Sequence, residues 1–159
     1  MIIGCAEGKF ASGNGEVKDC AKGTYQNEKG QTSCKPCSAG KYGTDMKATA
    51  ESQCKQCPVN TYSSATAVDA KNKCNKCPSG RKSTQTGQSD LSSCEESPSG
   101  RYGKANGVFQ DCVAGTYQDE KGQTSCKPCE AGTYGDTTGT DKKADCKPCL
   151  LYTSDAADE

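Results

Sequence analysis

The chain has 159 residues, with twenty basic residues balanced by twenty acidic ones, no His, no Trp, and very little Val, Ile, Leu or Phe. So few apolar side chains cannot bury the area that offsets chain entropy, which excludes a large hydrophobic core, and no stretch approaches the roughly 20 apolar residues of a membrane span. The dispersed, balanced charge excludes a nucleic-acid footprint or a basic membrane patch, and the absence of His removes the commonest general base and the commonest zinc ligand.

Cysteine supplies what the apolar residues lack. The chain has 14 cysteines, a proportion typical of a disulfide scaffold in which crosslinks replace a hydrophobic core. Adding 92 to the numbers of six cysteines leads to cysteine again at five positions and to Ser97 at the sixth. The six are Cys5, Cys20, Cys34, Cys37, Cys54 and Cys57. Such a period predicts a small disulfide-rich fold, an elongated array of tandem cysteine-rich modules with short β-hairpins and turns and almost no helix.

Residues 1–4 open the chain, and we interpret them as the remnant of a preceding unit. The segment MIIGCAEGKF has neither the charged n-region nor the apolar h-region of a secretory signal, which for a disulfide array indicates a fragment of a longer protein. Two superunits follow in this interpretation: residues 5–96 form the first, and residues 97–149 form a second, truncated one.

Eight repeat openings follow one another, each beginning at a cysteine or at Ser97. They read CAEGKF from Cys5, CAKGTY from Cys20, CSAGKY from Cys37, CPVNTY from Cys57, CPSGRK from Cys77, SPSGRY from Ser97, CVAGTY from Cys112 and CEAGTY from Cys129. The fourth letter is glycine or, once, Asn60, which predicts a left-handed turn position. Between opening and closure, segments such as QNEKGQTS predict tight turns that link short strand pairs.

The sixth letter of the opening is aromatic in every unit except the one that carries Lys82 there. The aromatic residues are Phe10, Tyr25, Tyr42, Tyr62, Tyr102, Tyr117 and Tyr134. An aromatic at a fixed offset from a cysteine predicts a miniature core, in which the ring lies on a disulfide and a tyrosine hydroxyl reaches solvent. The alternative, an aromatic ladder that binds a ligand, stays open on the sequence.

The exception at Ser97 favours pairing between neighbouring cysteines of one unit. The predicted pairs are Cys20–Cys34, Cys37–Cys54, Cys57–Cys74, Cys77–Cys94, Cys112–Cys126 and Cys129–Cys146. This scheme leaves Cys5 and Cys149 unpaired and needs no cysteine at 97, whereas alternate pairing would leave Cys77 seeking a mate there. Spacing does not fix connectivity, so both schemes stay open.

The repeat rhythm stops at Leu150. Residues 150–159, LLYTSDAADE, resemble a translated sequencing adapter of the transposase type, and the match begins at Cys149. We therefore interpret 150–159 as a non-native tail and exclude it from the fold.

The openings CSAGKY, CVAGTY and CEAGTY, with CxxC joints between neighbouring units, carry a family resemblance. They resemble the ephrin-receptor-like cysteine-rich repeats, which are related to EGF-like modules, and the first half of a tumour necrosis factor receptor module. The resemblance covers about residues 5–149 and implies an extracellular, disulfide-laddered rod within a surface receptor or a large secreted protein. The chain departs from the pattern at Ser97, at Lys82, and at Cys20 and Cys112, which open units without a CxxC joint.

Zinc is the rival chemistry. Cys34-x2-Cys37 and Cys54-x2-Cys57 have the spacing of an intracellular four-cysteine zinc site. Against it, the three successive CxxC pairs do not divide into complete four-ligand sites.

The predicted function is non-enzymatic, with no catalytic residue, cofactor or metal site. We expect an extracellular spacer or stalk, or a protein-binding segment, of a larger surface or secreted protein. The expected partner is a protein ligand or a matrix component, and neither nucleic acid nor membrane is expected to contact this segment. A ligand-contacting cysteine-rich domain of a receptor ectodomain is the first alternative, and the zinc-binding array is the second.

Overall fold

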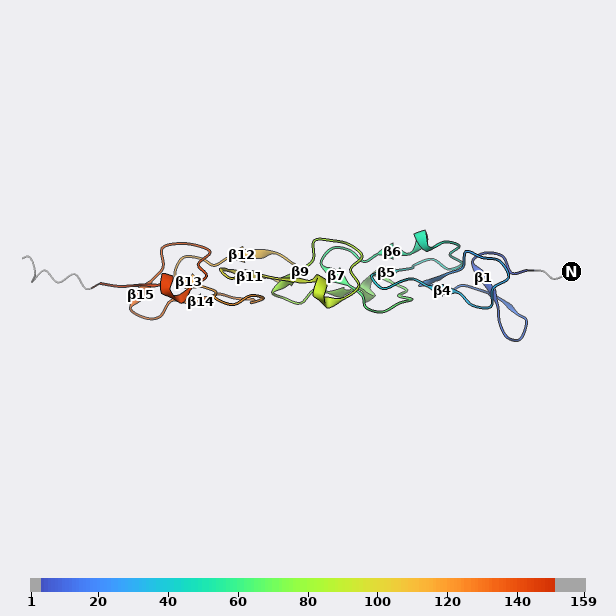
Figure 1. Ribbon diagram of the computed structural model, residues 1–159, viewed down its shortest axis with the longest axis horizontal. Coiled ribbons are helices and arrows are strands. Elements are labelled where there is room, and N and C mark those ends of the chain that lie inside the picture. The colour runs from blue at the N-terminus through green and yellow to red at the C-terminus, as the bar shows by residue number, and fades with distance from the viewer. Residues whose placement is uncertain (1–3, 151–159) are drawn as a thin grey trace, which may run out of the picture. The chain divides into compact units, whose positions relative to one another are not determined.

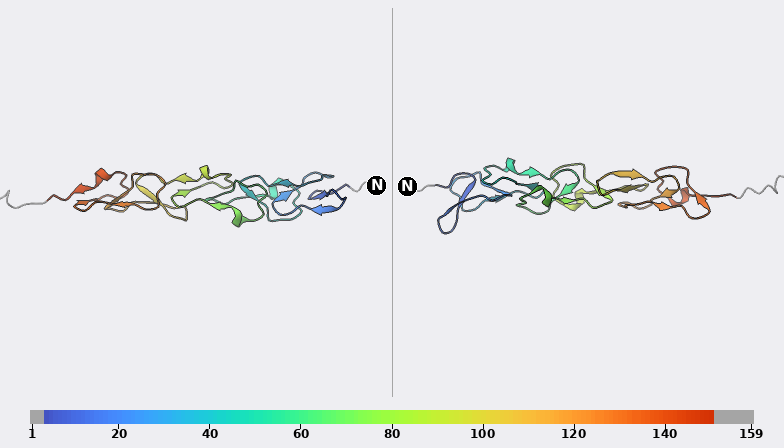
Figure 2. Two further views of the ribbon diagram at one scale, coloured as in Figure 1. Left: turned by 90° about the horizontal axis from the view of Figure 1, so that it is seen from below. Right: turned by 180° about the vertical axis from the view of Figure 1, so that it is seen from behind.

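The computed structural model describes residues 4–150, whose course is shown in Figures 1 and 2. In this range the regular structure consists of antiparallel two-stranded sheets and single turns of 3₁₀ helix, with no α-helix. The prediction of small disulfide-rich modules built from short hairpins is confirmed. The predicted adapter-derived tail lies outside the described residues except for Leu150, and so does the predicted N-terminal remnant except for Gly4.

The strands are two or three residues long and pair with their neighbours in sequence. The sheets are β1 (Lys9–Ala11) with β2 (Val17–Asp19), β3 (Thr24–Tyr25) with β4 (Lys35–Pro36), β5 (Lys41–Tyr42) with β6 (Lys55–Gln56), β7 (Thr61–Tyr62) with β8 (Asn75–Lys76), β9 (Arg81–Lys82) with β10 (Glu95–Glu96), β11 (Arg101–Gly103) with β12 (Phe109–Asp111), β13 (Thr116–Tyr117) with β14 (Lys127–Pro128) and β15 (Thr133–Tyr134) with β16 (Lys147–Pro148). The 3₁₀ turns are η1 (Glu51–Gln53), η2 (Lys71–Lys73), η3 (Leu91–Ser93) and η4 (Lys143–Asp145).

The chain divides into two compact parts. The first runs to Pro78 and includes Ser83–Glu95, and the second comprises Ser79–Lys82 and the residues from Glu96 onward. Within each part the hairpins follow one another in chain order (Figure 1). The superunits 5–96 and 97–149 were defined by the period of the cysteines and not by compactness. The division into these superunits stays a prediction.

Cysteine forms most of the buried interior. Among the described residues, nine of the twelve buried hydrophobic side chains are cysteines, and Ala48, Val68 and Tyr117 complete the set. Crosslinked sulfur therefore takes the place that aliphatic side chains occupy in an ordinary domain.

Each opening turn needs a residue with positive φ. In the unit that opens at Cys20, the Thr24 N–H donates to Ala21 O at 3.1 Å, and Gly23 has a φ of +82°. The Thr24 hydroxyl donates to the same carbonyl at 2.7 Å. Asn60 occupies the equivalent position with a φ of +61°, which Asn tolerates better than other side chains do. The turn therefore leads directly into the strand that carries the aromatic residue.

Candidate functional site

Six disulfides staple the array, and each joins an opening cysteine to the closing cysteine of the same unit. The bridges are Cys20–Cys34, Cys37–Cys54, Cys57–Cys74, Cys77–Cys94, Cys112–Cys126 and Cys129–Cys146. Cys5, which is buried, and Cys149, which is exposed, are free. In the chain-entropy model, closing a loop of this length contributes about 3 kcal/mol per bridge. The disulfides therefore hold six of the eight units, and other interactions have to join one unit to the next.

Backbone hydrogen bonds make that joint. Between the units that open at Cys20 and Cys37, the Gly23 N–H donates to Gly43 O at 2.9 Å and the Cys37 N–H donates to Gly23 O at 2.8 Å. The Lys47 N–H, in the loop of the later unit, donates to Cys20 O at 2.9 Å. Equivalent sets of three recur at several joints in both parts of the chain. Because these bonds use only main-chain groups, the joint is largely independent of side-chain identity.

Several loops also reach the unit two places earlier. A Cβ added at Gly40 would lie 2.2 Å from Gly87 O, and one added at Gly8 would lie 2.4 Å from Lys47 O. Real Cβ atoms do not approach a carbonyl oxygen this closely, so glycine is required for space as well as for its positive φ. The sequence predicted the left-handed turn, and the structure adds the close contact that also selects glycine there.

Ser97 keeps its place in the ladder without a disulfide. Its N–H donates to Gly80 O and its carbonyl accepts from the Gly122 N–H, both at 2.8 Å. Its side chain is fully buried, and the hydroxyl donates to Gln123 O at 3.3 Å. The unit from Ser97 has no closing cysteine, and serine therefore replaces cysteine there without leaving a thiol unpaired.

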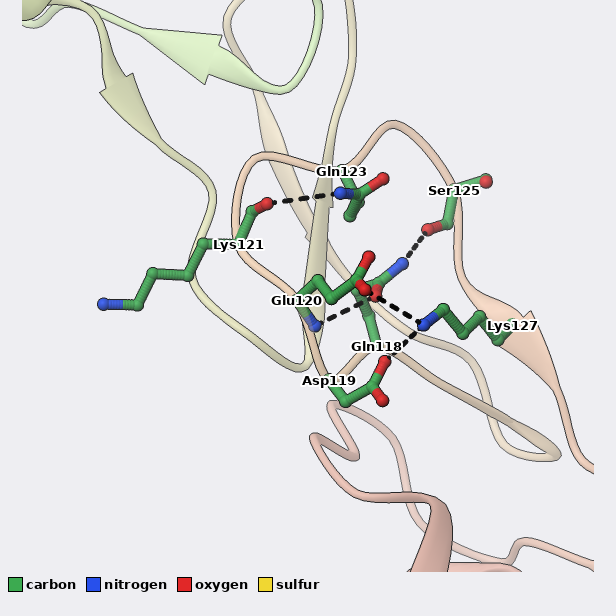
Figure 3. A network of polar contacts seen from close by, with 7 residues as sticks. All are labelled: Gln118, Asp119, Glu120, Lys121, Gln123, Ser125 and Lys127. Carbon is green, nitrogen blue, oxygen red and sulfur yellow. Dashed lines mark hydrogen bonds and ion pairs between the residues drawn. The ribbon is translucent and has the colours of Figure 1, made fainter.

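Two units are short, because their bridges Cys20–Cys34 and Cys112–Cys126 span 14 residues and the other four span 17. A buried glutamine stabilises the loop of each short unit, a role that the sequence did not reveal (Figure 3). The side-chain amide of Gln118 donates to Ser125 O at 2.7 Å, and its Oε1 accepts from the Glu120 N–H at 3.1 Å. Gln26 makes the same two bonds, at 2.7 and 3.1 Å, with Ser33 and Glu28. The sequence predicted a tight turn in the segment QNEKGQTS, but only the structure shows that the first glutamine of this segment is buried.

A lysine clamps the outer side of the same loop. Lys127 Nζ donates to Asp119 Oδ1 at 2.6 Å and lies 3.8 Å from Glu120 Oε1 (Figure 3). The hydrogen bond lowers the pKa of the Asp119 carboxyl and raises the pKa of Lys127. Lys35 Nζ takes the equivalent place in the earlier short unit, 2.8 Å from Asn27 Oδ1. These groups are exposed and screened by solvent, so their contribution to the stability of the loop is small.

The aromatic positions lie on the first strand of each hairpin. Their exposure varies: Tyr117 is buried, Tyr134 is exposed and the others are half-buried. Lys82, which stands in the aromatic position of its unit, places its Nζ 4.4 Å from the ring centroid of Phe109 in the next hairpin. This cation–π contact supplies an aromatic partner to the unit that lacks one. No signal in the sequence pointed to Phe109.

Shallow hollows recur beside the bridges of the two short units. Phe10 and Cys34 border one of about 400 Å³, and Tyr102 and Cys126 border one of about 310 Å³. The units of Phe10 and Tyr102 contain no bridge of their own, so each ring borders the hollow beside the bridge of the following unit. That the seven aromatic residues pack on disulfides stays a prediction.

The bridges use the cysteines that the zinc alternative requires as thiolates. Cys34, Cys37, Cys54 and Cys57 are all disulfide-bonded, and a cystine sulfur is not a zinc ligand. No group of three or more metal-ligating side chains occurs among residues 4–150. Within the same range there is no helix of the length and hydropathy needed to cross a membrane.

Short hairpins, closed by a disulfide in six of the eight units and joined to the next unit by main-chain hydrogen bonds, define a tandem cysteine-rich repeat array of an extracellular type. Residues 8–54 and 100–146 match the family described as tyrosine-protein kinase ephrin type A/B receptor-like, and the chain belongs to this family. The two matches are offset by 92 residues, the period of the cysteines. This repeat family is a non-catalytic module type. The search of curated proteins found no match.

Proposed function

We propose that this segment is an extracellular spacer within a larger surface or secreted protein, and that it holds other domains apart. The observation that carries the proposal is the repeated joint: a disulfide inside the unit and main-chain hydrogen bonds to the next. A joint that depends on backbone groups and glycine can be repeated many times while the exposed side chains vary.

Membership of a receptor-like repeat family supports placing the segment in an ectodomain or a secreted protein. Stable disulfides also need an oxidising compartment. A ligand-contacting role is the second candidate, and the observation that favours it is the presence of open hollows beside the bridges.

Small-angle X-ray scattering of the oxidised chain tests the spacer role. A globular domain of this length would have a radius of gyration of about 15 Å, and an unfolded chain about 40 Å. We expect the oxidised chain to lie clearly above the globular value with the scattering of a rod of constant cross-section, and to approach the unfolded value after reduction. A radius of gyration equal to the globular value for the oxidised chain would contradict the spacer proposal, because a compact particle cannot separate its neighbours.

A further inference from the structure

Two neighbouring units of the first part present equivalent hollows of different charge. The hollow beside β5 and β6 has a volume of about 680 Å³, and the one beside β7 and β8 about 640 Å³. Their linings correspond at an offset of twenty residues, and each includes the closing cysteine of its bridge, Cys54 or Cys74. The two sites therefore share a backbone geometry, and the side chains set them apart.

In the first hollow the lysines already have partners. Lys41 Nζ donates to Glu51 Oε1 at 2.9 Å, and Lys55 Nζ donates to Thr44 Oγ1 at 3.1 Å. The carboxylate of Glu51, which lines this hollow, neutralises part of its charge.

In the second hollow the equivalent of Glu51 is Lys71, and the equivalent of Gln56 is Lys76. No acidic residue lines it. Among residues 4–150, neither ammonium group has a hydrogen bond or an ion pair. Asp69 is the one acidic residue between Lys55 and Lys76, and Lys73 Nζ already contacts it at 2.7 Å. The hollow therefore carries positive charge that this part of the chain does not neutralise.

Apolar groups also line the second hollow. Pro58 and Cys74 are among its lining residues, and Pro58 stands where the neighbouring unit has Ser38. Val59, the next residue, is 53% exposed. Thr61 and Asn75 add groups that can hydrogen-bond to a backbone. Apolar surface flanked by two lysines is complementary to an apolar side chain flanked by carboxylates.

We propose that the hollow beside β7 and β8 docks an acidic peptide segment of a protein partner. An aromatic or aliphatic side chain of the segment lies against Pro58 and Cys74, and its flanking carboxylates pair with Lys71 and Lys76. A sulfated polysaccharide would use the lysines without the apolar lining. This docking surface goes beyond the spacer role, and scattering measurements do not bear on it.

The test is titration of the oxidised chain with the peptide Asp-Glu-Phe-Glu-Asp, followed by amide chemical shifts and by anisotropy of a dye-labelled copy. We expect shifts at Thr61, Lys71 and Lys76, and binding that weakens with added salt because the lysines are exposed. Lys71→Glu places in this hollow the carboxylate that the neighbouring hollow has at Glu51, and it should weaken binding by about tenfold. Lys55→Glu makes the same change of charge in the neighbouring hollow and should leave the affinity within about twofold.

Three outcomes would overturn the proposal. The shifts could fall outside residues 58–76, or both variants could weaken binding equally, which would indicate a diffuse charge effect. The peptide with Ala in place of Phe could bind as tightly while heparin competes fully, which would indicate a polyanion site. Amide chemical shifts of each variant that match those of the parent chain away from the substituted residue establish that folding is intact.

Discussion

Gly40→Ala tests whether the close contact between second-neighbour units holds the array together. The new Cβ would lie 2.2 Å from Gly87 O, and Gly40 has a φ of +81°. The left-handed conformation costs an L-residue about 1–2 kcal/mol. The clash is with a backbone atom and cannot be relieved by a rotamer change, so the backbone at residue 40 has to shift. We expect this shift to open the hydrogen bond from the Gly40 N–H to Ser63 O, which is 2.8 Å long. Losing it and leaving a polar group unpaired costs about 1–3 kcal/mol more, which gives a total of about 2–5 kcal/mol.

Gly132→Ala is the matched control. Gly132 has a φ of +83°, the equivalent place in its opening turn, and nothing within 4 Å of an added Cβ. It should cost the left-handed strain alone, about 1–2 kcal/mol. Amide hydrogen exchange of the oxidised chain reports each site locally, which suits a repeat array better than a global transition. Equal losses of protection around the two glycines would refute the reasoning, because the contact with Gly87 would then contribute nothing.

Four further perturbations follow from the site. Gln118→Ala removes two hydrogen bonds made by a side chain that is 2% exposed. It should lower the free energy of local opening at the Glu120 amide by about 1–3 kcal/mol and so speed its hydrogen exchange, whereas Gln123→Ala should not. Unchanged exchange would show that these two bonds contribute nothing to the loop. Ser97→Cys should raise the number of titratable thiols in denaturant from two to three, since that unit has no closing cysteine; a seventh bridge would contradict pairing within units. Lys82→Ala removes the contact with Phe109 and should lower the local unfolding free energy by about 0.5–1 kcal/mol, with Lys104→Ala as the exposed control that should not change it. Lysine partners lower the pKa values of Asp19, Asp119 and Asp136. The contribution of these carboxylates to the free energy of unfolding is therefore fully present above the unfolded pKa of about 3.9, and it is lost as pH falls through their lower folded pKa values. The pKa values of Lys127 and Lys147 are raised. Their contribution to the free energy of unfolding is therefore fully present below the unfolded pKa of about 10.4, and it is lost as pH rises through their higher folded pKa values. The thermal midpoint should therefore be flat between about pH 5 and 9, and a steep slope within that window would contradict these assignments.

The sequence predicted those features that follow from covalent chemistry and local turns. Cysteine spacing and the glycine after each opening indicated short hairpins, because a bridge closed over such a loop leaves the chain few alternatives. Of the two connectivities that the sequence left open, the structure has pairing between neighbours. The turn residue Asn60 was interpretable in the same way, since Asn tolerates positive φ.

Contacts between units could not be predicted from the sequence. The approach of Gly40 to Gly87 joins residues two units apart, and the spacing within one unit carries no information about it. The inward turn of Gln26 and the stacking of Lys82 on Phe109 depend on which side chains the assembled ladder brings together. The unequal charge of the two hollows likewise becomes visible only when the structure shows that both are lined in the same way, with Lys71 in the position that Glu51 has in the neighbouring unit.

The central claim is that disulfides within units, and not a metal or a hydrophobic core, stabilise the fold of this chain. Intact mass spectrometry of the non-reduced protein, followed by proteolytic mapping of the bridges, tests it most directly. Six bridges lower the mass by about 12 Da, two hydrogens for each bridge. We expect that loss of mass, two free thiols at Cys5 and Cys149, and linked peptides that join Cys37 to Cys54 and Cys57 to Cys74. A full complement of free thiols, bound metal that a chelator releases, or peptides linked across the CxxC joints would contradict it.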